Sequence, residues 1–332
     1  MNKIWYKKNL LSYLLSPLSL IYQLIIAIRY YLYKTKFLKT HHINIPVIIV
    51  GNITVGGTGK TPLVITIVKE LKKQGFHPGI ISRGYGGKSK TWPQTVNENS
   101  DPFWVGDEAV LMAKKTGVPV VVGPMRVQDA QKLLELNCNV IVSDDGLQHY
   151  ALAHDIEIAV IDASRGLGNG FCLPAGPLRE PKKRLDSVDF IISNGSITPF
   201  EKERCCVSFR GDFSMHFVID DIIAINNGTT CSTAGVFVAI AGIGNPERFF
   251  NSLREKEIVF TSKIFPDHHH FKKSDFDFVA QNEIILMTEK DAVKCAAFAD
   301  NRFYVVRGHA EVDSELIQSL LKRLDYGFNV MA

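Results

Sequence analysis

A glycine-rich stretch near the beginning of the chain contains the residue types that bind phosphate. Residues 50–64 read VGNITVGGTGKTPLV. Glycines let backbone N–H groups close around phosphate oxygens, and the N-terminus of a following helix adds partial positive charge. Lys60 is placed to reach the β- and γ-phosphates of a nucleotide, and Thr61 to offer its hydroxyl to Mg²⁺. The candidate nucleotide-binding residues of this phosphate loop are Thr54, Val55, Gly56, Gly57, Thr58, Gly59, Lys60 and Thr61.

One position departs from the strict phosphate-loop pattern G-x-x-x-x-G-K-[ST]. That pattern requires a glycine at position 54, where this chain has Thr54. The following GGTGKT keeps the positions that contact phosphate and is similar to the shorter variant loop of some P-loop enzymes. The alternative is a glycine-rich turn that only packs. The order of apolar run, glycine loop and helical pattern favours nucleotide binding.

A pair of carboxylates ends a second apolar run and is a candidate magnesium site. Residues 139–149 read NVIVSDDGLQH, with Asp144 and Asp145 at the end of the predicted strand. In P-loop proteins a carboxylate at this place binds Mg²⁺ directly or through water. The alternative is an ordinary turn before Gly146. Together with the phosphate loop, the pair predicts a metal set of Thr61, Asp144 and Asp145.

The first 45 residues differ in charge from the rest of the chain. They contain seven Lys or Arg residues and no acidic residue, and the first acidic residue is Glu70. Because the formal net charge of all 332 residues is +4, the part after residue 45 is net negative. This distribution argues against a nucleic-acid-binding protein and indicates an anionic partner at the N-terminus.

The N-terminal segment is also apolar, since residues 10–28 read LLSYLLSPLSLIYQLIIAI. A helix lying in the cytoplasmic leaflet satisfies the basic flanks on both sides. A spanning helix is long enough, but it would leave Lys3, Lys7 and Lys8 on the wrong side of the membrane. A buried structural hairpin is a third possibility. A cleaved signal peptide is not expected, because no small-residue cleavage site follows.

The composition is that of an ordinary globular protein, 46% apolar and 22% charged. The six cysteines show no C-x-x-C spacing. We therefore expect reduced thiols, without a disulfide framework or a structural zinc site.

Short apolar runs alternate with helical patterns along most of the chain, which is typical of a parallel sheet with helices on both faces. We expect an α/β fold: a P-loop NTPase-like, doubly wound parallel sheet with a second, smaller α/β domain and an N-terminal membrane-associated helix. Strands are expected at 46–50, 79–82, 119–122, 139–143, 157–162 and 189–193, and then near 216–219, 236–241, 257–261, 284–288 and 303–306. Helices are expected near 60–74, 107–116, 126–137, 246–255, 273–281 and 313–324.

Eight sequence blocks occur in an order that resembles a known family. They read VGNITVGGTGKTP, ISRGYGG, VGDEAVLMA, SDDGLQH, LPAGPLREP, AGIGNPERFF, FPDHHHF and TEKDAVK. Together they resemble the tetraacyldisaccharide 4'-kinases, which phosphorylate a lipid A precursor in Gram-negative bacteria. The resemblance covers nearly all of residues 1–300, and Thr54 falls within the variation of that family.

The resemblance implies roles for residues outside the phosphate loop. It places a catalytic pair at Asp107 and His268, which would draw the proton from a sugar hydroxyl. From the residues alone, Asp107 is also a candidate helix cap, and His268 to His270 are also a candidate metal cluster or solvated turn. The choice among the three histidines stays open. The resemblance further implies nucleotide, magnesium, phosphate or substrate contacts for Gln148, His149, Arg179 and Glu180. It suggests that Arg83 and Tyr85 line the same cleft and that residues 288–291 face the nucleotide.

The implied activity is transfer of the γ-phosphate of ATP, with Mg²⁺, to the 4'-hydroxyl of a tetraacyl disaccharide 1-phosphate. The implied location is the cytoplasmic face of the bacterial inner membrane, peripheral or monotopic. Two rivals stay open: a membrane-recruited ATPase switch, which usually has lysine where this chain has Val55, and a soluble ligase or synthetase. The expected division of the chain is a membrane-associated helix at 1–36, a P-loop kinase domain at 37–200, an irregular linker at 201–235 and a second α/β domain at 236–332.

Overall fold

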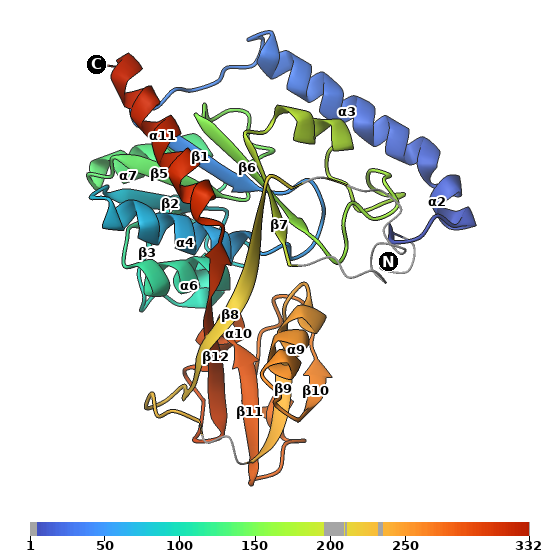
Figure 1. Cartoon of the computed structure of the whole chain (residues 1–332), viewed down its shortest axis with the longest axis vertical. Coiled ribbons are helices and arrows are strands. Elements are labelled where there is room, and N and C mark those ends of the chain that lie inside the picture. Colours follow the sequence, from blue (N-terminus) through green and yellow to red (C-terminus); the bar gives the residue numbers. More distant parts are fainter. Residues whose placement is uncertain (1–4, 196–208, 210, 232–234, 332) are drawn as a thin grey trace.

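The computed structural model describes residues 5–195, 209, 211–231 and 235–331 (Figure 1). Lys3, Cys205, Cys206 and part of the predicted linker lie outside the described residues. Within them the chain forms one 12-stranded sheet in the order β10-β9-β11-β12-β8-β7-β6-β1-β5-β2-β4-β3. The strands are β1 Val47–Gly51, β2 Pro78–Ser82, β3 Gln94–Val96, β4 Val120–Val122, β5 Val140–Asp144, β6 Ile156–Asp162, β7 Phe190–Asn194, β8 Phe213–Ala224, β9 Val236–Ala241, β10 Phe260–Ile264, β11 Glu283–Thr288 and β12 Phe303–Val312.

Helices cover both faces of this sheet (Figure 1). They are α2 Leu10–Leu14, α3 Ser16–Lys34, α4 Lys60–Lys73, α5 Pro102–Val105, α6 Asp107–Thr116, α7 Arg126–Glu135, α9 Pro246–Glu255, α10 Glu289–Cys295 and α11 Ser314–Met331, with 3₁₀ turns η1 Lys182–Ser187 and η2 Lys273–Phe276.

The strands that carry the candidate site run parallel and lie side by side. β1 pairs with β5 on one side and β6 on the other, and β7 continues from β6, all in parallel register. All five residues of β1 are buried, as expected for a strand covered on both faces. The carboxyl ends of β1, β5, β6 and β7 therefore meet at one edge of the sheet, where ligands bind in open α/β folds.

Two apolar clusters hold this first part of the sheet between its helices. Leu63 and Val64 of α4 share one cluster with residues of α6 and with Leu316, Leu320 and Leu324 of α11. We call β9, β10 and β11 with α9 and α10 the lower part of the molecule, and the region around the phosphate loop the upper part (Figure 1). The last helix α11 thus packs on the upper part, although it follows the lower part in sequence. The other face is covered by α7 and the segments around Leu147 and Leu152, with α3 outside them.

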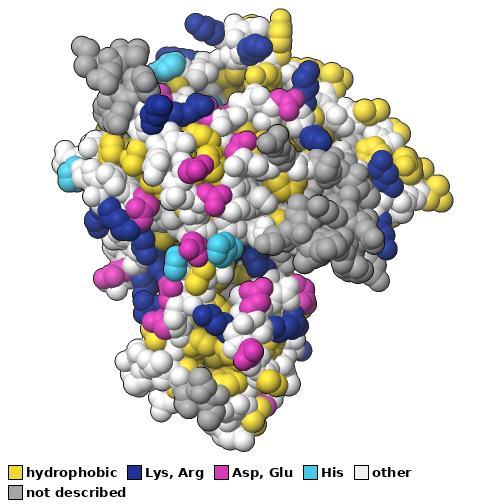
Figure 2. Space-filling view, in the orientation of Figure 1, with side chains coloured by type: hydrophobic (Ala, Val, Ile, Leu, Met, Phe, Trp, Pro, Cys, Tyr) yellow, Lys and Arg dark blue, Asp and Glu magenta, His cyan; other side chains and the backbone are white. Residues whose placement is uncertain are grey.

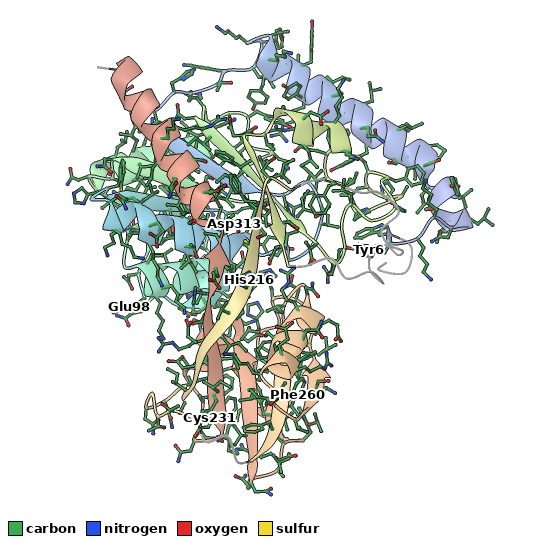
Figure 3. The ribbon with its side chains drawn as sticks, in the orientation of Figure 1. Tyr6, Glu98, His216, Cys231, Phe260 and Asp313 are labelled. Atoms are coloured by element: carbon green, nitrogen blue, oxygen red, sulfur yellow. The ribbon has the colours of Figure 1, made fainter. Side chains whose placement is uncertain are left out.

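Two long antiparallel strands, β8 and β12, connect the upper and lower parts. Their pairing extends from Met215 opposite Val312 to Ala224 opposite Tyr304. Figure 3 shows His216 and Asp313 where this ribbon leaves the upper part, and Phe260 in the lower part beside it. The lower part packs α9 and α10 on β9, β10 and β11.

The structure confirms the predicted α/β class, with several differences in detail. The helix expected at 273–281 is only the short turn η2, and β8 is longer than the strand expected near 216–219. Sequence analysis missed β3, α5 and α10. The division into domains stays a prediction.

The N-terminal helix α3 lies against the body by one side and exposes apolar residues on the other. Ser19 Oγ donates to the carbonyl oxygen of Cys172 at 2.8 Å, and the Tyr22 hydroxyl donates to that of Arg179 at 3.1 Å. Apolar side chains on the outer side are at least half exposed: Leu18, Leu20, Ile21, Leu24, Ile25 and Ile28. Figure 2 shows them as a yellow ridge over α3. In the described residues, no helix has the length and apolar character needed to cross a membrane.

Candidate active site

The phosphate loop joins β1 to α4 and is held in shape by two asparagines. Asn52 Nδ2 donates to Thr58 Oγ1 at 3.2 Å, and Asn194 Nδ2, at the end of β7, donates to the Thr58 carbonyl oxygen at 2.7 Å. Gly56 and Gly59 have φ values of 101° and 92°, which favour glycine. A Cβ atom on Gly59 would lie 1.9 Å from Asn194 Nδ2. Glycine at position 59 is therefore required both by the backbone and by the asparagine that fastens the loop.

Thr54 and Val55 lie at the start of the loop and are held by another segment. Thr54 is buried and pairs with Leu178 in an isolated antiparallel bridge, and Val55 N donates to the carbonyl oxygen of Pro177 at 2.9 Å. Thr54 is not among the residues with positive φ. Position 54 therefore does not need the glycine of the strict pattern.

Lys60, the first residue of α4, faces Asp145. Its Nζ lies 3.5 Å from Asp145 Oδ1, and Arg179 NH1 donates to both oxygens of the same carboxylate at 3.0 and 2.9 Å. Burial raises the pKa of Asp145, but the charges of Lys60 and Arg179 outweigh it and bring the pKa well below its usual range. Asp145 is therefore ionised at neutral pH.

Asp144, the last residue of β5, is in a different environment. It is 2% exposed, and its Oδ1 has no hydrogen-bond partner in the described part of the chain. Burial, with the charge of Glu108, raises the pKa of Asp144 to about 7. An unpartnered carboxylate oxygen beside a phosphate loop fits a bound divalent cation, with Thr61 and Asp145 as the other protein groups.

No group of three or more His, Cys, Asp or Glu side chains could hold a metal ion by itself within the described ranges. Magnesium that is bound together with nucleotide phosphates and water needs only one or two carboxylates, so Asp144 and Asp145 suffice for it. The alternative of a metal cluster at His268 to His270 has no support in the described residues.

Glu180 and Gln148 form a polar network beside the loop. Gln148 Nε2 donates to Glu180 Oε2 at 2.9 Å and to the carbonyl oxygen of Asn52 at 3.2 Å. The Tyr150 hydroxyl also donates to Glu180, and Arg184 Nε lies 3.8 Å from Glu180 Oε2. Glu180 is thus tied to the beginning of the phosphate loop.

His149 lies next to this network and is surrounded by positive charge. Burial, together with the charges of the Arg126 and Arg83 guanidinium groups, lowers the pKa of His149 to about 4. The imidazole is therefore neutral at pH 7, and any contact it makes with a phosphate is a neutral hydrogen bond.

Asp107 begins α6 and meets His268 from 161 positions further along the chain. His268 Nδ1 lies 3.2 Å from both carboxylate oxygens of Asp107, which is 4% exposed. Burial raises the pKa of Asp107, but the hydrogen bond from His268 and the charges of Lys290 and Lys294 outweigh it and lower the pKa. Asp107 is therefore ionised at neutral pH and can accept a proton.

The three adjacent histidines point to different partners. His268 lies at Asp107, whereas His269 Nε2 lies 2.9 Å from Asp275 Oδ2 and the His270 ring packs against Phe103. Asp107 Oδ1 also accepts a hydrogen bond from Glu108 N at 2.8 Å, so it contributes to the start of α6 as well. The geometry favours His268 as the partner of Asp107.

A pocket of about 330 Å³ opens beside this pair. At the wall of this pocket, the ring centroids of Tyr85 and His268 are 4.7 Å apart. Other lining residues are Phe103, Asp107, His270, Lys272 and Lys294. The pocket leaves room for an acceptor molecule to reach Asp107.

Sequence reasoning missed the residues by which the lower part reaches the phosphate loop. Arg165 NH2 donates to the carbonyl oxygen of Gly244 at 3.1 Å. Asn245 Nδ2 donates to Asp162 Oδ2 at 2.9 Å, and Arg248 NH2 lies 2.8 Å from the same oxygen. Asp162 ends β6 as Asp144 ends β5. Its position at the end of a predicted strand could therefore have identified it as a candidate site residue.

Residues 288–291, which are expected to face the nucleotide, make contacts within α10 and with the Asp107–His268 pair. Thr288 Oγ1 accepts a hydrogen bond from Asp291 N and so caps α10. Lys290 reaches the Asp107–His268 pair, with its Nζ 3.2 Å from His268 Nε2. The pair and the phosphate loop are close in space, since a Cβ atom on Gly244 would lie 2.8 Å from Gly57 N in the loop and 3.1 Å from the Oδ2 of Asp267, the residue before His268.

A buried parallel strand, a glycine loop leading into a helix that begins with lysine, and carboxylates at the end of the adjacent strand define a P-loop nucleotide-binding protein. Beside the loop, this protein has an ionised carboxylate that is open to a pocket and hydrogen-bonded to a histidine.

The comparisons with known proteins agree and are more specific. A family model described as "LpxK: Tetraacyldisaccharide-1-P 4'-kinase" matches residues 11–325. The chain is 48% identical over 309 residues to the tetraacyldisaccharide 4'-kinase of Nitrosococcus oceani, covering 91% of this chain and 88% of that protein. It is 47% identical to that of Haemophilus influenzae, covering 95% and 92%. The solved structure of LpxK from Aquifex aeolicus in complex with ATP superposes with a TM-score of 0.76 at 30% identity, covering 96% and 99%. The chain belongs to the tetraacyldisaccharide 4'-kinase family.

Proposed function

We propose that this chain transfers the γ-phosphate of ATP to the 4'-hydroxyl of a tetraacyl disaccharide 1-phosphate, a step in lipid A biosynthesis. The observation that carries the proposal is the Asp107–His268 pair beside the phosphate loop, in a member of this family. A nucleotide switch that only hydrolyses ATP has no need of a second carboxylate that opens to an acceptor pocket.

The phosphate loop binds the triphosphate of ATP. Its backbone N–H groups and the N-terminus of α4 face the phosphate oxygens, while Asn52 and Asn194 keep the loop closed around them. Lys60 neutralises the β- and γ-phosphates, and Arg179 then keeps Asp145 paired. Mg²⁺ held by Thr61, Asp144 and Asp145 supplies further neutralisation of charge on the transferring group.

Asp107 is the base for the acceptor. Its carboxylate takes the proton of the 4'-hydroxyl while the hydroxyl oxygen uses an electron pair to bond to the γ-phosphorus. The bond from that phosphorus to the bridging oxygen breaks, and its electron pair leaves with ADP. His268 orients the carboxylate through its hydrogen bond. Most of the rate then comes from positioning and charge stabilisation, as is usual for phosphoryl transfer.

The acyl chains of such an acceptor stay in a bilayer, and α3 provides the means to reach it. Its outer side exposes apolar residues, with Leu24 and Ile25 each 60% exposed. Lys7 and Lys8 precede these residues, while Lys34 and Lys36 follow them, so both flanks are attracted to anionic headgroups. The chain is therefore proposed to lie on the cytoplasmic face of the inner membrane, with α3 in the interface.

The location is tested by washing membranes with high salt and then with detergent. The wild-type chain should stay bound in high salt and leave in detergent, because apolar burial holds it. Leu24→Glu with Ile25→Glu should be released by salt alone. Val259→Glu changes a residue that is 86% exposed in the lower part, and it should behave as the wild type. Equal release of all three would contradict insertion of α3.

The activity is tested with γ-labelled ATP and a tetraacyl disaccharide 1-phosphate in mixed micelles. Label should move to the lipid and should be lost from it in the Asp107→Asn variant. A disaccharide that already has a 4'-phosphate is the control acceptor and should remain unlabelled. Release of free phosphate without labelled lipid would favour an ATPase switch and overturn the proposal.

A further inference from the structure

Lys290 occupies a central place in the charge network around the Asp107–His268 pair. It lies on α10, and its side chain is 14% exposed. Its Nζ lies 2.9 Å from Glu108 Oε1, 3.3 Å from Asp267 Oδ1 and 3.2 Å from His268 Nε2. A lysine ammonium has three hydrogens and no acceptor. The three neighbours therefore account for all three of its N–H bonds.

The contact between Lys290 and His268 determines where the imidazole carries its proton. An ammonium only donates, so His268 Nε2 must accept and cannot itself carry hydrogen. Asp267 also lies near this nitrogen, but its Oδ1 is 3.7 Å away, beyond hydrogen-bond distance. The proton of a neutral imidazole is then on Nδ1, directed at Asp107.

The ammonium form of Lys290 is strongly favoured. Burial lowers the pKa of Lys290, but the charges of Glu108, Asp107 and Asp267 outweigh it and raise the pKa above its usual value. Lys290 is therefore an ammonium at neutral pH and donates to His268.

Resting on the proposed function, we propose that Lys290 is a positioning residue of the kinase site, which holds His268 as the neutral Nδ1–H tautomer. In that form the imidazole donates to Asp107 and orients its carboxylate toward the acceptor. It does not relay the proton, because Nδ1 already carries hydrogen and Nε2 is occupied by the ammonium. The proton of the 4'-hydroxyl stays on Asp107 until the product leaves.

The other groups around His268 do not replace Lys290 in this role. Lys294, one turn further along α10, lies 3.6 Å from Asp107 Oδ2 and pairs with Asp291 at 2.8 Å, so its ammonium is directed at these carboxylates. Tyr85 covers one face of the ring. The charged and titratable groups in contact with His268 are thus Asp107 from α6, Lys290 from α10, Asp267 from its own loop, and Tyr85. Lys294 acts on the Asp107 carboxylate, and Glu108 acts on the Lys290 ammonium.

The tautomer is read directly by ¹⁵N NMR of histidine-labelled full-length protein in detergent micelles at pH 7.5. Long-range ¹H–¹⁵N correlations distinguish the two neutral tautomers from the imidazolium, and His268→Gln assigns the signal. The wild type should show Nδ1 protonated, which is the less common form of a free imidazole. An Nε2–H tautomer or an imidazolium at His268 would overturn the inference.

Variants of Lys290 provide a second readout in the kinase assay. Lys290→Met should populate the Nε2–H form and lower kcat roughly 10- to 100-fold, with KM for ATP within about twofold, because only the orientation of Asp107 is lost. Lys290→Arg should keep the tautomer and much of kcat. Unchanged kcat in Lys290→Met, or a parallel loss in both variants with the tautomer intact, contradicts a positioning role.

Two features keep the test decisive. Lys290→Met leaves Glu108 and Asp267 without their cation, so Lys290→Met with Glu108→Gln serves as a version with less unpaired charge. If both variants fail to fold, the wild-type tautomer alone decides. If the protein shows the Nδ1–H tautomer but does not label lipid, the proposed kinase activity is wrong and the proposed effect of Lys290 on the tautomer is kept. If the protein labels lipid but shows the Nε2–H tautomer, the kinase activity is kept and the proposed effect of Lys290 is wrong.

Discussion

Residues 51–61 form the phosphate loop within one strand–loop–helix unit, whereas Asp107 and His268 meet across 161 positions of the chain. The backbone course of the loop follows local sequence, with glycines where φ is positive and a helix that starts at Lys60, and Asn194, Pro177 and Leu178 fasten it from elsewhere in the chain. The Asp107–His268 pair, by contrast, depends on how the lower part is placed on the upper part through the β8–β12 ribbon.

This difference separates binding from chemistry. Phosphate groups are common to the ligands of P-loop proteins, and the glycines and helix start that suit them can be recognised in local sequence. The acid–histidine pair is proposed to serve an acceptor particular to this family, and it is assembled from a helix start on one part and a loop on the other. Substitutions in the loop should therefore change nucleotide affinity, and those at the pair should change the rate after binding.

The largest effect is expected at Asp107. Asp107→Asn keeps the size of the side chain but removes the base, so kcat should fall about 10³-fold while the Kd for ATP stays within about twofold. Single-turnover phosphorylation and equilibrium ATP binding measure the two quantities separately. A loss of ATP affinity as large as the loss of rate would contradict the separation of binding from chemistry, because the Asp107–His268 pair would then belong to the nucleotide site.

The opposite pattern is expected at Gly59. In Gly59→Ala the new methyl group would meet Asn194 Nδ2 at 1.9 Å, at a φ of 92°. The loop must open, so the Kd for ATP should rise roughly 10- to 100-fold. Gly75→Ala is the matched control, since φ there is 86° and nothing lies within 4 Å of the added carbon. It should lower stability a little and leave ATP binding unchanged.

The comparison also explains what sequence reasoning found and what it missed. The loop, α4 and the carboxylates after β5 were visible because their signals are contiguous, and the buried strands read as apolar runs. α10 was missed because seven residues show no helical period, although Thr288 followed by Asp291 is a capping signal. Lys290 went unnoticed with it.

Other elements depend on partners far away in the chain. β8 is longer than expected, and its two acidic residues are paired from β12: Asp221 lies opposite Arg307, and the Asp220 carboxylate contacts His309. No local pattern predicts a strand whose charges are paired by residues more than 80 positions later. The choice of His268 among three histidines has the same origin, since the partner that distinguishes it is on α6.

A smaller effect, on stability and not on rate, is expected at His149 in the phosphate-loop region. Its folded-state pKa of about 4 lies below the ordinary value of 6.5, so the folded state binds fewer protons than the unfolded state between these values. Folding therefore becomes less favourable as pH falls below about 6.5, and the penalty is complete below about 4. The wild type should lose about 2 kcal/mol more than His149→Gln between pH 7.5 and 5 in urea titrations. Parallel pH profiles for the two proteins would mean that the imidazole is not desolvated.

The smallest effect tests whether α3 supports the phosphate-loop region as well as reaching the bilayer. The Tyr22 hydroxyl bonds to the carbonyl oxygen of Arg179, whose guanidinium holds Asp145 opposite Lys60. Tyr22→Phe should lower the free energy of unfolding by about 1 kcal/mol, because a partly buried carbonyl loses its donor. It should also raise KM for ATP about two- to threefold and leave kcat unchanged.

Tyr31→Phe is the matched control on the same helix, since Tyr31 is 64% exposed. Neither the free energy of unfolding nor KM for ATP should change in this variant. If Tyr22→Phe lowers kcat and leaves KM alone, the helix acts on the acid–histidine pair, and the separation between the two regions fails.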